Sequence, residues 1–401
     1  MFEIIFAFLP LLSGYIFCGI GLDFVILAIA GLITLKRRRG NVLIDNTNRD
    51  FVILFSYVLL KDVLIVLFGQ SDSSESFHKF LSTVAYIFFF FVLLKRRFNQ
   101  EKFYKGLKYS GGLYTAGLIY HLIIIYVFEM PARGISIIPG YQFSNVNMPE
   151  RPRSFFSEPA ALATAMLPLL FYSLHRKDYK WSMLATFTIF MSTSTTGVIL
   201  AAVLWLLEFL MRTGQKKQKM MVIIAFMVAV IFLMRTEFTQ DALMAVQNRL
   251  RGGGSTSIRV FLGFEVLKTM HPVQLIAGLL YNKPYDYAVM YLNLFSDDSF
   301  VRGIITLGAG YFFVNTFCSL LFRYGAIGMF LYLKVYKGML FIKNYPGRAL
   351  AIMTLIQTIG DSMLFNSYYF YIMLILFYLA QEKETLYEGA AYRIGIRKPD
   401  A

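Results

Sequence analysis

The chain has 401 residues, of which 57% are hydrophobic and only 16% charged, and its mean hydropathy is +0.57. This balance excludes an ordinary soluble domain and predicts an integral membrane protein. The formal net charge of +15 is accounted for by basic residues that flank apolar runs and meet anionic lipid heads, so we expect no nucleic-acid partner. Cys18 and Cys318 lie in separate apolar segments, which predicts neither a disulfide framework nor a metal site.

Apolar runs approach the length that a membrane-spanning helix needs along most of the chain. We predict an all-α polytopic membrane protein that forms one integral domain over 1–401, with about 12 spans and a range of roughly 10–12. The expected spans are 2–17, 20–35, 51–68, 80–94, 106–128, 159–174, 181–193, 196–211, 219–234, 316–338, 349–361 and 367–380. The pairs 181–193/196–211 and 349–361/367–380 are short and resemble helical hairpins that bend before they cross the membrane fully.

Basic clusters at the ends of apolar runs predict the orientation, because cytoplasmic loops are rich in Lys and Arg. These clusters lie at 36–39, 95–97, 176–177 and 216–219. We therefore expect a multi-pass protein of the bacterial inner membrane with both termini in the cytoplasm. Two loops then face the periplasm, at 129–158 and 235–315. Within the second loop, 241–251 and 257–270 have the apolar spacing of amphipathic surface helices.

The periplasmic loops carry arginine where the positive-inside rule expects little basic charge. The set is Arg133, Arg151, Arg153, Arg235, Arg249, Arg251, Arg259 and Arg302, with Arg323 at the edge of a span. The only lysines on this side are Lys79, Lys268 and Lys283. A planar guanidinium binds phosphate through two parallel hydrogen bonds. The pattern therefore indicates recognition of an anion.

Two arginine-containing motifs are candidates for chemistry. The segment 150–159 (ERPRSFFSEP) places Arg153 and Glu158 before an apolar run. Glu158-Pro159 is typical of a helix start, because proline suits the first turn and an acid suits the positive end of the helix dipole; alternatively, Arg153 binds a phosphate and Glu158 acts as a general base. The segment 249–259 (RLRGGGSTSIR) has the composition of a phosphate cradle or of a flexible surface loop.

Other polar groups are weaker candidates. The run Ser192–Gly197 fits the tip of a helical hairpin, with a role in lining a phosphate cavity as the alternative. His271 is expected to be a surface or packing residue, and the spacing of Asp286, Asp297 and Asp298 gives little support for a divalent cation. Ionisable residues within spans, namely Asp23, Lys61, Asp62 and Asp361, lie near span ends or where they can pair.

The layout resembles the O-antigen and exopolysaccharide polymerases (Wzy-type), which are related to the O-antigen ligases. The resemblance rests on many spans, the R-S-F-F-S-E-P motif ending at Pro159, a hydroxyl-rich hairpin, a large periplasmic loop with S-x-R, and Asn315 followed by Gly325 and Gly328. The ligases generally have a His before that Asn, whereas this chain has Val314. The difference favours a polymerase.

The resemblance implies a metal-independent, inverting glycosyltransferase without a cofactor, which joins undecaprenyl-pyrophosphate-linked repeat units on the periplasmic face of the membrane. We expect Glu158, Arg153 and Arg259 to act in catalysis, and a larger set to bind pyrophosphate: Arg151, Arg249, Arg251, Arg235 and Arg323. Lipid-linked glycans, membrane lipid and a chain-length regulator protein are the expected partners. An O-antigen ligase with lipid A core as acceptor, and a lipid-linked oligosaccharide flippase, stay open as alternatives.

Overall fold

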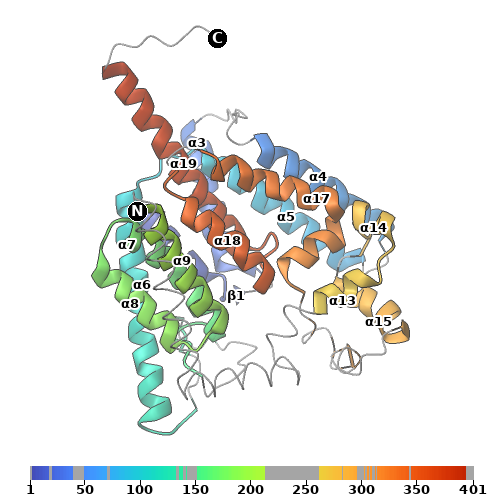
Figure 1. Cartoon of the computed structure of the whole chain (residues 1–401), viewed down its shortest axis with the longest axis horizontal. Coiled ribbons are helices and arrows are strands. Elements are labelled where there is room, and N and C mark those ends of the chain that lie inside the picture. Colours follow the sequence, from blue (N-terminus) through green and yellow to red (C-terminus); the bar gives the residue numbers. More distant parts are fainter. Residues whose placement is uncertain are drawn as a thin grey trace.

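The computed structural model describes residues 2–17, 20–38, 49–69, 73–131, 135–138, 141, 151–212, 262–281, 283–295, 302, 305–306, 308, 312, 314–342 and 345–393. Over these residues the chain is almost entirely helical, as expected (Figure 1). The predicted span at 219–234, the segment 241–251 and most of the loop at 129–150 lie outside the described residues.

The helices follow the apolar runs of the sequence. They are α1 (Phe2–Phe6), α2 (Leu9–Leu12), α3 (Leu22–Arg38), α4 (Arg49–Phe68), α5 (Ser73–Leu94), α6 (Gln100–Tyr126), α7 (Pro159–His175), α8 (Tyr179–Met191), α9 (Thr195–Arg212), α13 (Gly263–Lys268), α14 (Pro272–Ala277), α15 (Pro284–Phe295), α17 (Thr316–Leu340), α18 (Arg348–Gly360) and α19 (Ser367–Arg393). Figure 1 shows α6 to α9 gathered at one end of the molecule, α13 to α15 at the other, and α17, α18 and α19 between them.

The described residues include three helices that are long and apolar enough to cross a membrane: α4, Ser76–Leu94 of α5, and α17. Shorter apolar helices are α7, Thr195–Met211 of α9, α18 and Ser367–Gln381 of α19. These helices support a membrane protein. They do not reproduce the expected number of about 12 spans, because several expected spans form helices shorter than the roughly 17–25 residues that crossing requires.

The predicted single span over 2–17 is wrong. This segment forms the short helices α1 and α2, followed by a two-stranded antiparallel hairpin of β1 (Ile16–Phe17) and β2 (Ile20–Gly21). Pro10 lies in the first turn of α2, and a proline that has no N–H to donate begins a helix more readily than it continues one. The apolar residues of α1 and α2 therefore belong to two short, largely buried helices, whereas Ile16 and Phe17 of β1 are exposed.

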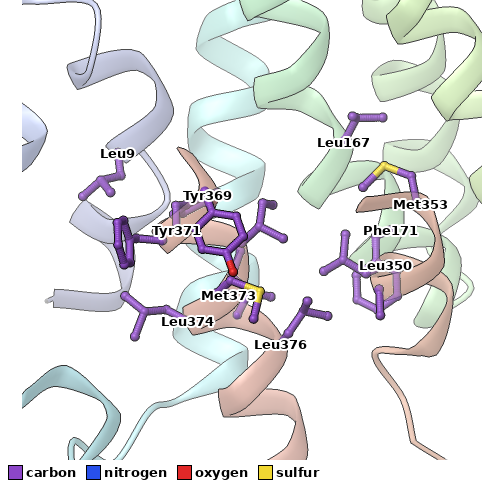
Figure 2. Close-up of a cluster of buried hydrophobic side chains, with 14 of the residues drawn as sticks. Leu9, Leu167, Phe171, Leu350, Met353, Tyr369, Tyr371, Met373, Leu374 and Leu376 are labelled. Atoms are coloured by element: carbon purple, nitrogen blue, oxygen red, sulfur yellow. The ribbon is translucent and has the colours of Figure 1, made fainter. Parts of the chain in front are cut away.

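The core forms around α19, which is buried on several sides. In Figure 2, side chains of α19 lie between Leu9 of α2 and a group from α7 and α18 that includes Leu167, Phe171, Leu350 and Met353. Some buried tyrosines in this core have internal hydrogen-bond partners: Tyr378 Oη donates to the carbonyl of Leu93 over 2.7 Å. Such a bond stabilises the core because an apolar surrounding offers no water to a buried hydroxyl.

The helices of the large loop pack against the start of α17. Leu262, Val266 and Tyr287 form a second buried cluster with Cys318 and Phe322 of α17. The prediction of helical structure within 257–270 is confirmed over Gly263–Lys268. These helices therefore attach the large loop to α17, which is long and apolar enough to cross a membrane, and the contacts determine which polar groups of the loop lie near α17.

Candidate functional site

The loop before α7 is held tightly against α6. Ser154 has a left-handed backbone (φ 55°), and its Oγ donates to the carbonyl of Tyr114 over 2.8 Å. The backbone N–H of Arg153 donates to His121 Nδ1 over 3.3 Å. A Cβ on Gly117 would lie 2.3 Å from Ser154 Oγ, so a glycine is required here for the loop to approach α6.

Arg153 and Glu158 have opposite environments. The side chain of Arg153 is fully buried, whereas that of Glu158 is exposed. Glu158 is the N-cap residue of α7, with an extended backbone and no capping hydrogen bond from its side chain, and Pro159 follows in the first turn. The predicted helix start is confirmed. Glu158 is accessible to solvent, whereas the burial of Arg153 favours a role in positioning the loop.

Arg151 connects this loop to the hydroxyl-rich hairpin between α8 and α9. Its Nε donates to Thr193 Oγ1 over 2.9 Å, and its Nη2 donates to the carbonyl of Thr193. Thr193 is held in a left-handed conformation at the tip of the hairpin (φ 59°). Ser194 Oγ accepts from the N–H of Gly197 over 3.2 Å. The predicted architectural role of Ser192–Gly197 is confirmed, and the hairpin also holds one of the candidate arginines.

An apolar groove of about 780 Å³ lies beside the same loop. It is lined by Gly117, Tyr120 and Ile124 of α6, by Met130, and by Phe155 of the loop. The groove is wide and open, and its lining is mainly apolar. It therefore offers a surface for a hydrocarbon chain or for the apolar face of a sugar ring beside the loop that leads to Glu158.

A second pocket, which we name the basic pocket, gathers three cations from distant parts of the sequence. It has a volume of about 300 Å³ and is lined by Lys79 of α5, Lys283 just before α15, and Arg323 of α17. Ser319 and Ser362 add hydroxyl groups to the same lining. Cations and hydroxyl donors around a small cavity are suited to binding an anion with several oxygen atoms, such as a phosphate or pyrophosphate.

Arg323 is the buried member of the basic pocket. Its side chain is only 7% exposed and its Nη2 donates to Asp62 Oδ1 of α4 over 2.9 Å. Tyr324 Oη donates to the same oxygen over 3.0 Å. Arg323 Nε has no hydrogen-bond partner among the described residues. The guanidinium is thus buried and fixed by Asp62 at the wall of the pocket.

A break in α17 places Arg323 in this position. Gly325 interrupts the helix with φ 66° and ψ −171°, and Gly278, at the end of α14, has φ 78°. A Cβ on Gly325 would lie 2.2 Å from the carbonyl oxygen of Ile276, and one on Gly278 would lie 2.3 Å from that of Arg323. Only glycines at both positions allow the two backbones to approach this closely. The approach brings the loop that contains Lys283 to Arg323.

The two regions lie at the same end of the helical bundle. Asn315 caps α17 by accepting from the N–H of Cys318, and Thr316 donates to the carbonyl of Asp361 through both its N–H (2.8 Å) and its Oγ1 (2.7 Å). Next to Asp361, Gly360 packs near Thr196 of the hydroxyl-rich hairpin. The loop after α18 therefore joins the basic pocket to the hairpin that holds Arg151.

Several predicted site residues have no described structure. Arg235, Arg249, Arg251 and Arg259 all lie outside the described residues, as does the glycine-rich segment around them. The expected structural role of His271 is confirmed, because it forms a reciprocal capping box with Gln274 at the start of α14. Within the described ranges, no three His, Cys, Asp or Glu side chains gather as metal ligands.

Sequence reasoning missed the grouping of Lys79 and Lys283 with Arg323, and the contact of His121 with the Arg153 backbone. The two lysines stand out only as basic residues in segments predicted to face the periplasm, where such residues are expected to be few. Asp62 carried a clearer signal, because an acid within an apolar run requires a partner. Its partner is Arg323.

Comparisons with protein-family models, with curated proteins and with solved structures find no match to this chain.

Proposed function

We propose that the protein is a glycosyltransferase that polymerises lipid-pyrophosphate-linked oligosaccharide repeat units at the membrane surface. The observation that carries the proposal is the basic pocket, in which Lys79, Lys283 and Arg323 surround a cavity of about 300 Å³ beside apolar helices. A lipid-linked pyrophosphate combines an apolar tail with a multiply charged anion. A site that binds it therefore needs cations next to an apolar surface, and these residues and helices provide both.

In the proposed reaction, a hydroxyl oxygen of the acceptor sugar attacks the anomeric carbon of the donor glycan. The bond between that carbon and the pyrophosphate oxygen breaks, and its electron pair stays on the pyrophosphate. Negative charge therefore grows on the leaving group as the bond breaks. Cations placed at that group stabilise the transition state more than the ground state, which is the condition for faster chemistry.

The acceptor hydroxyl must also lose a proton. Glu158 is the proposed base or orienting group, because its carboxylate is exposed at the start of α7. Arg151 and Arg153 would act by fixing the loop that carries Glu158: the first holds the hairpin through Thr193, and the second is buried against α6. The apolar groove around Phe155 would receive a sugar face or a lipid chain of one substrate.

Val314 also lines the basic pocket. It occupies the position at which the O-antigen ligases generally have a His before the Asn. A pocket with cations and no imidazole supports a polymerase over a ligase, because stabilisation of the leaving group remains while the candidate base of the ligase is missing. The acceptor would then be a second lipid-linked repeat unit.

The test is polymerisation in vitro by purified protein, with a panel of synthetic undecaprenyl-pyrophosphate-linked oligosaccharides as substrates and EDTA present. Products are resolved as a glycan ladder on a gel. We expect a ladder that Lys79→Ala and Lys283→Ala each reduce about 10²–10³-fold, the range for removal of a group that stabilises developing charge. Glu158→Gln should reduce the ladder as well.

Lys268→Ala is the matched control, since Lys268 lies in the same loop region but is 69% exposed and pairs with Glu265. Its activity should equal that of the unchanged protein. An equal loss in Lys268→Ala would contradict the assignment of the basic pocket. The polymerase proposal would be replaced by transport if folded protein made no ladder and yet moved the same lipid between the leaflets of a liposome.

A further inference from the structure

A third cavity lies at the opposite end of α6 from the groove at Phe155. It has a volume of about 530 Å³ and lies between the first turns of α6 and the start of α8. Lys102, Lys105 and Lys108 line it, together with Tyr104, Tyr109 and Trp181. We name it the lysine pocket. It shares no residue with the basic pocket or with the loop around Arg153.

The ammonium groups and aromatic rings of this pocket lie close together. Lys108 Nζ is 4.8 Å from the ring centre of Tyr104 and 6.0 Å from that of Trp181. Lys105 Nζ lies 5.8 Å from the ring of Tyr109. Tryptophan and tyrosine concentrate where a membrane meets water, because their rings are apolar and their N–H or O–H groups are polar.

The acids near the lysine pocket are already engaged. Glu101 accepts from Arg176 Nη1 over 2.6 Å. Asp178 accepts from Tyr104 Oη over 2.8 Å and lies 3.9 Å from Lys108. Three lysines and one glutamate line the cavity itself, so its wall has an excess of positive charge. The complementary ligand is an anion.

The face of α6 that begins in this pocket continues as an exposed apolar stripe. Lys102, Lys105 and Tyr109 are followed at helical spacing by Leu113 and then Tyr120. Tyr109, Leu113 and Tyr120 are 53%, 37% and 53% exposed. From Tyr109 to Tyr120 the helix rises about 16 Å, and the stripe ends where Tyr120 begins to line the groove at Phe155. A ligand that matches both parts has an anionic head and a hydrocarbon chain.

We propose that the lysine pocket binds the headgroup of an anionic phospholipid, with one acyl chain along the exposed stripe of α6. The lysines bind the phosphate, and the aromatic rings pack around the glycerol region. The inference does not rest on the proposed glycosyl transfer, because it needs only a membrane protein with this charged and apolar surface.

Native mass spectrometry of detergent-purified protein tests this inference, with dioleoyl phosphatidylglycerol and dioleoyl phosphatidylcholine titrated in parallel. We expect one tightly retained phosphatidylglycerol and much weaker binding of phosphatidylcholine. The triple variant Lys102→Gln, Lys105→Gln, Lys108→Gln should lower the affinity for that phosphatidylglycerol about tenfold or more. Lys102 and Lys105 are exposed, and Asp178 keeps its hydrogen bond from Tyr104 when the half-buried Lys108 is replaced, so this variant is compatible with folding.

The matched control removes three basic charges elsewhere, through Lys36→Gln, Lys334→Gln and Lys337→Gln, and should keep the affinity. Three outcomes would overturn the inference. The first is an equal loss of affinity in the control variant, which would mean that the lipid binds through general surface charge. The second is equal retention of phosphatidylcholine. The third is displacement of the lipid by millimolar inorganic phosphate, which would assign the pocket to a soluble anion.

Discussion

The buried ion pair between Arg323 and Asp62 gives the sharpest prediction for stability. The two side chains are 7% and 3% exposed, and Arg323 Nη2 lies 2.9 Å from Asp62 Oδ1. Removing one partner leaves the other charge buried and uncompensated, at a cost of about 3–5 kcal/mol in the free energy of unfolding. Asp62→Leu and Arg323→Met should each show a loss of this size.

The double variant should lose far less free energy of unfolding than the sum of the losses in the two single variants. Without either charge, the main remaining penalty is the hydroxyl of Tyr324, which loses its acceptor on Asp62, at about 1–3 kcal/mol. The single losses would add to about 6–10 kcal/mol if the sites were independent. We therefore expect a coupling energy of at least about 3 kcal/mol.

The assay is unfolding by titration with sodium dodecyl sulfate in mixed micelles, followed by tryptophan fluorescence and circular dichroism, for the four members of the cycle. Additivity within about 0.5 kcal/mol would refute the ion-pair reasoning. The same proteins test function separately. The double variant should remain folded and still fail to polymerise glycan, because Arg323 is absent from the basic pocket.

Two further predictions concern glycines, each with a matched control. Gly325→Ala should be strongly destabilising because its Cβ would lie 2.2 Å from a backbone oxygen. Gly308→Ala should lose only about 1–2 kcal/mol, because Gly308 also has a positive φ (96°) but its Cβ would meet no atom of the described residues within 4 Å. Equal thermal shifts for the two variants would argue against the close approach. Gly117→Ala should lower polymerisation, because the added Cβ would lie 2.3 Å from Ser154 Oγ and displace that side chain. The control Gly112→Ala should keep activity, because the nearest contact of its added Cβ is at 3.8 Å. Full activity of Gly117→Ala would contradict a role for this loop.

Local patterns in the sequence predicted the elements well where a single segment determines the outcome. The apolar runs of α4, α5 and α17 gave helices of spanning length, and Glu158-Pro159 gave a helix start. The error at 2–17 has the same local origin, because hydropathy measures apolar content and overlooks the interruption by Pro10. The short segment at 349–361 was predicted to belong to a helical hairpin, and it forms the 13-residue helix α18.

The candidate site was only partly predictable, because it depends on contacts between distant segments. Arg323 and Glu158 were named from the sequence, whereas no local pattern indicates that Lys79 and Lys283 lie at the same cavity as Arg323. Their approach depends on the paired backbone contact at Gly278 and Gly325. The sequence does not indicate which two of the many glycines in the chain lie in contact.

The shortness of α8 and α18 has a consequence for depth within the membrane. Each helix has 13 residues and is therefore about 20 Å long, against about 30 Å for the hydrocarbon core of a bilayer. With their first residues at one interface, their far ends would stop about 10 Å short of the other. The hairpin at Thr193 and the loop after Gly360 would then form the floor of a basin recessed into the bilayer. A molecule anchored in lipid would reach that floor without being lifted from the membrane.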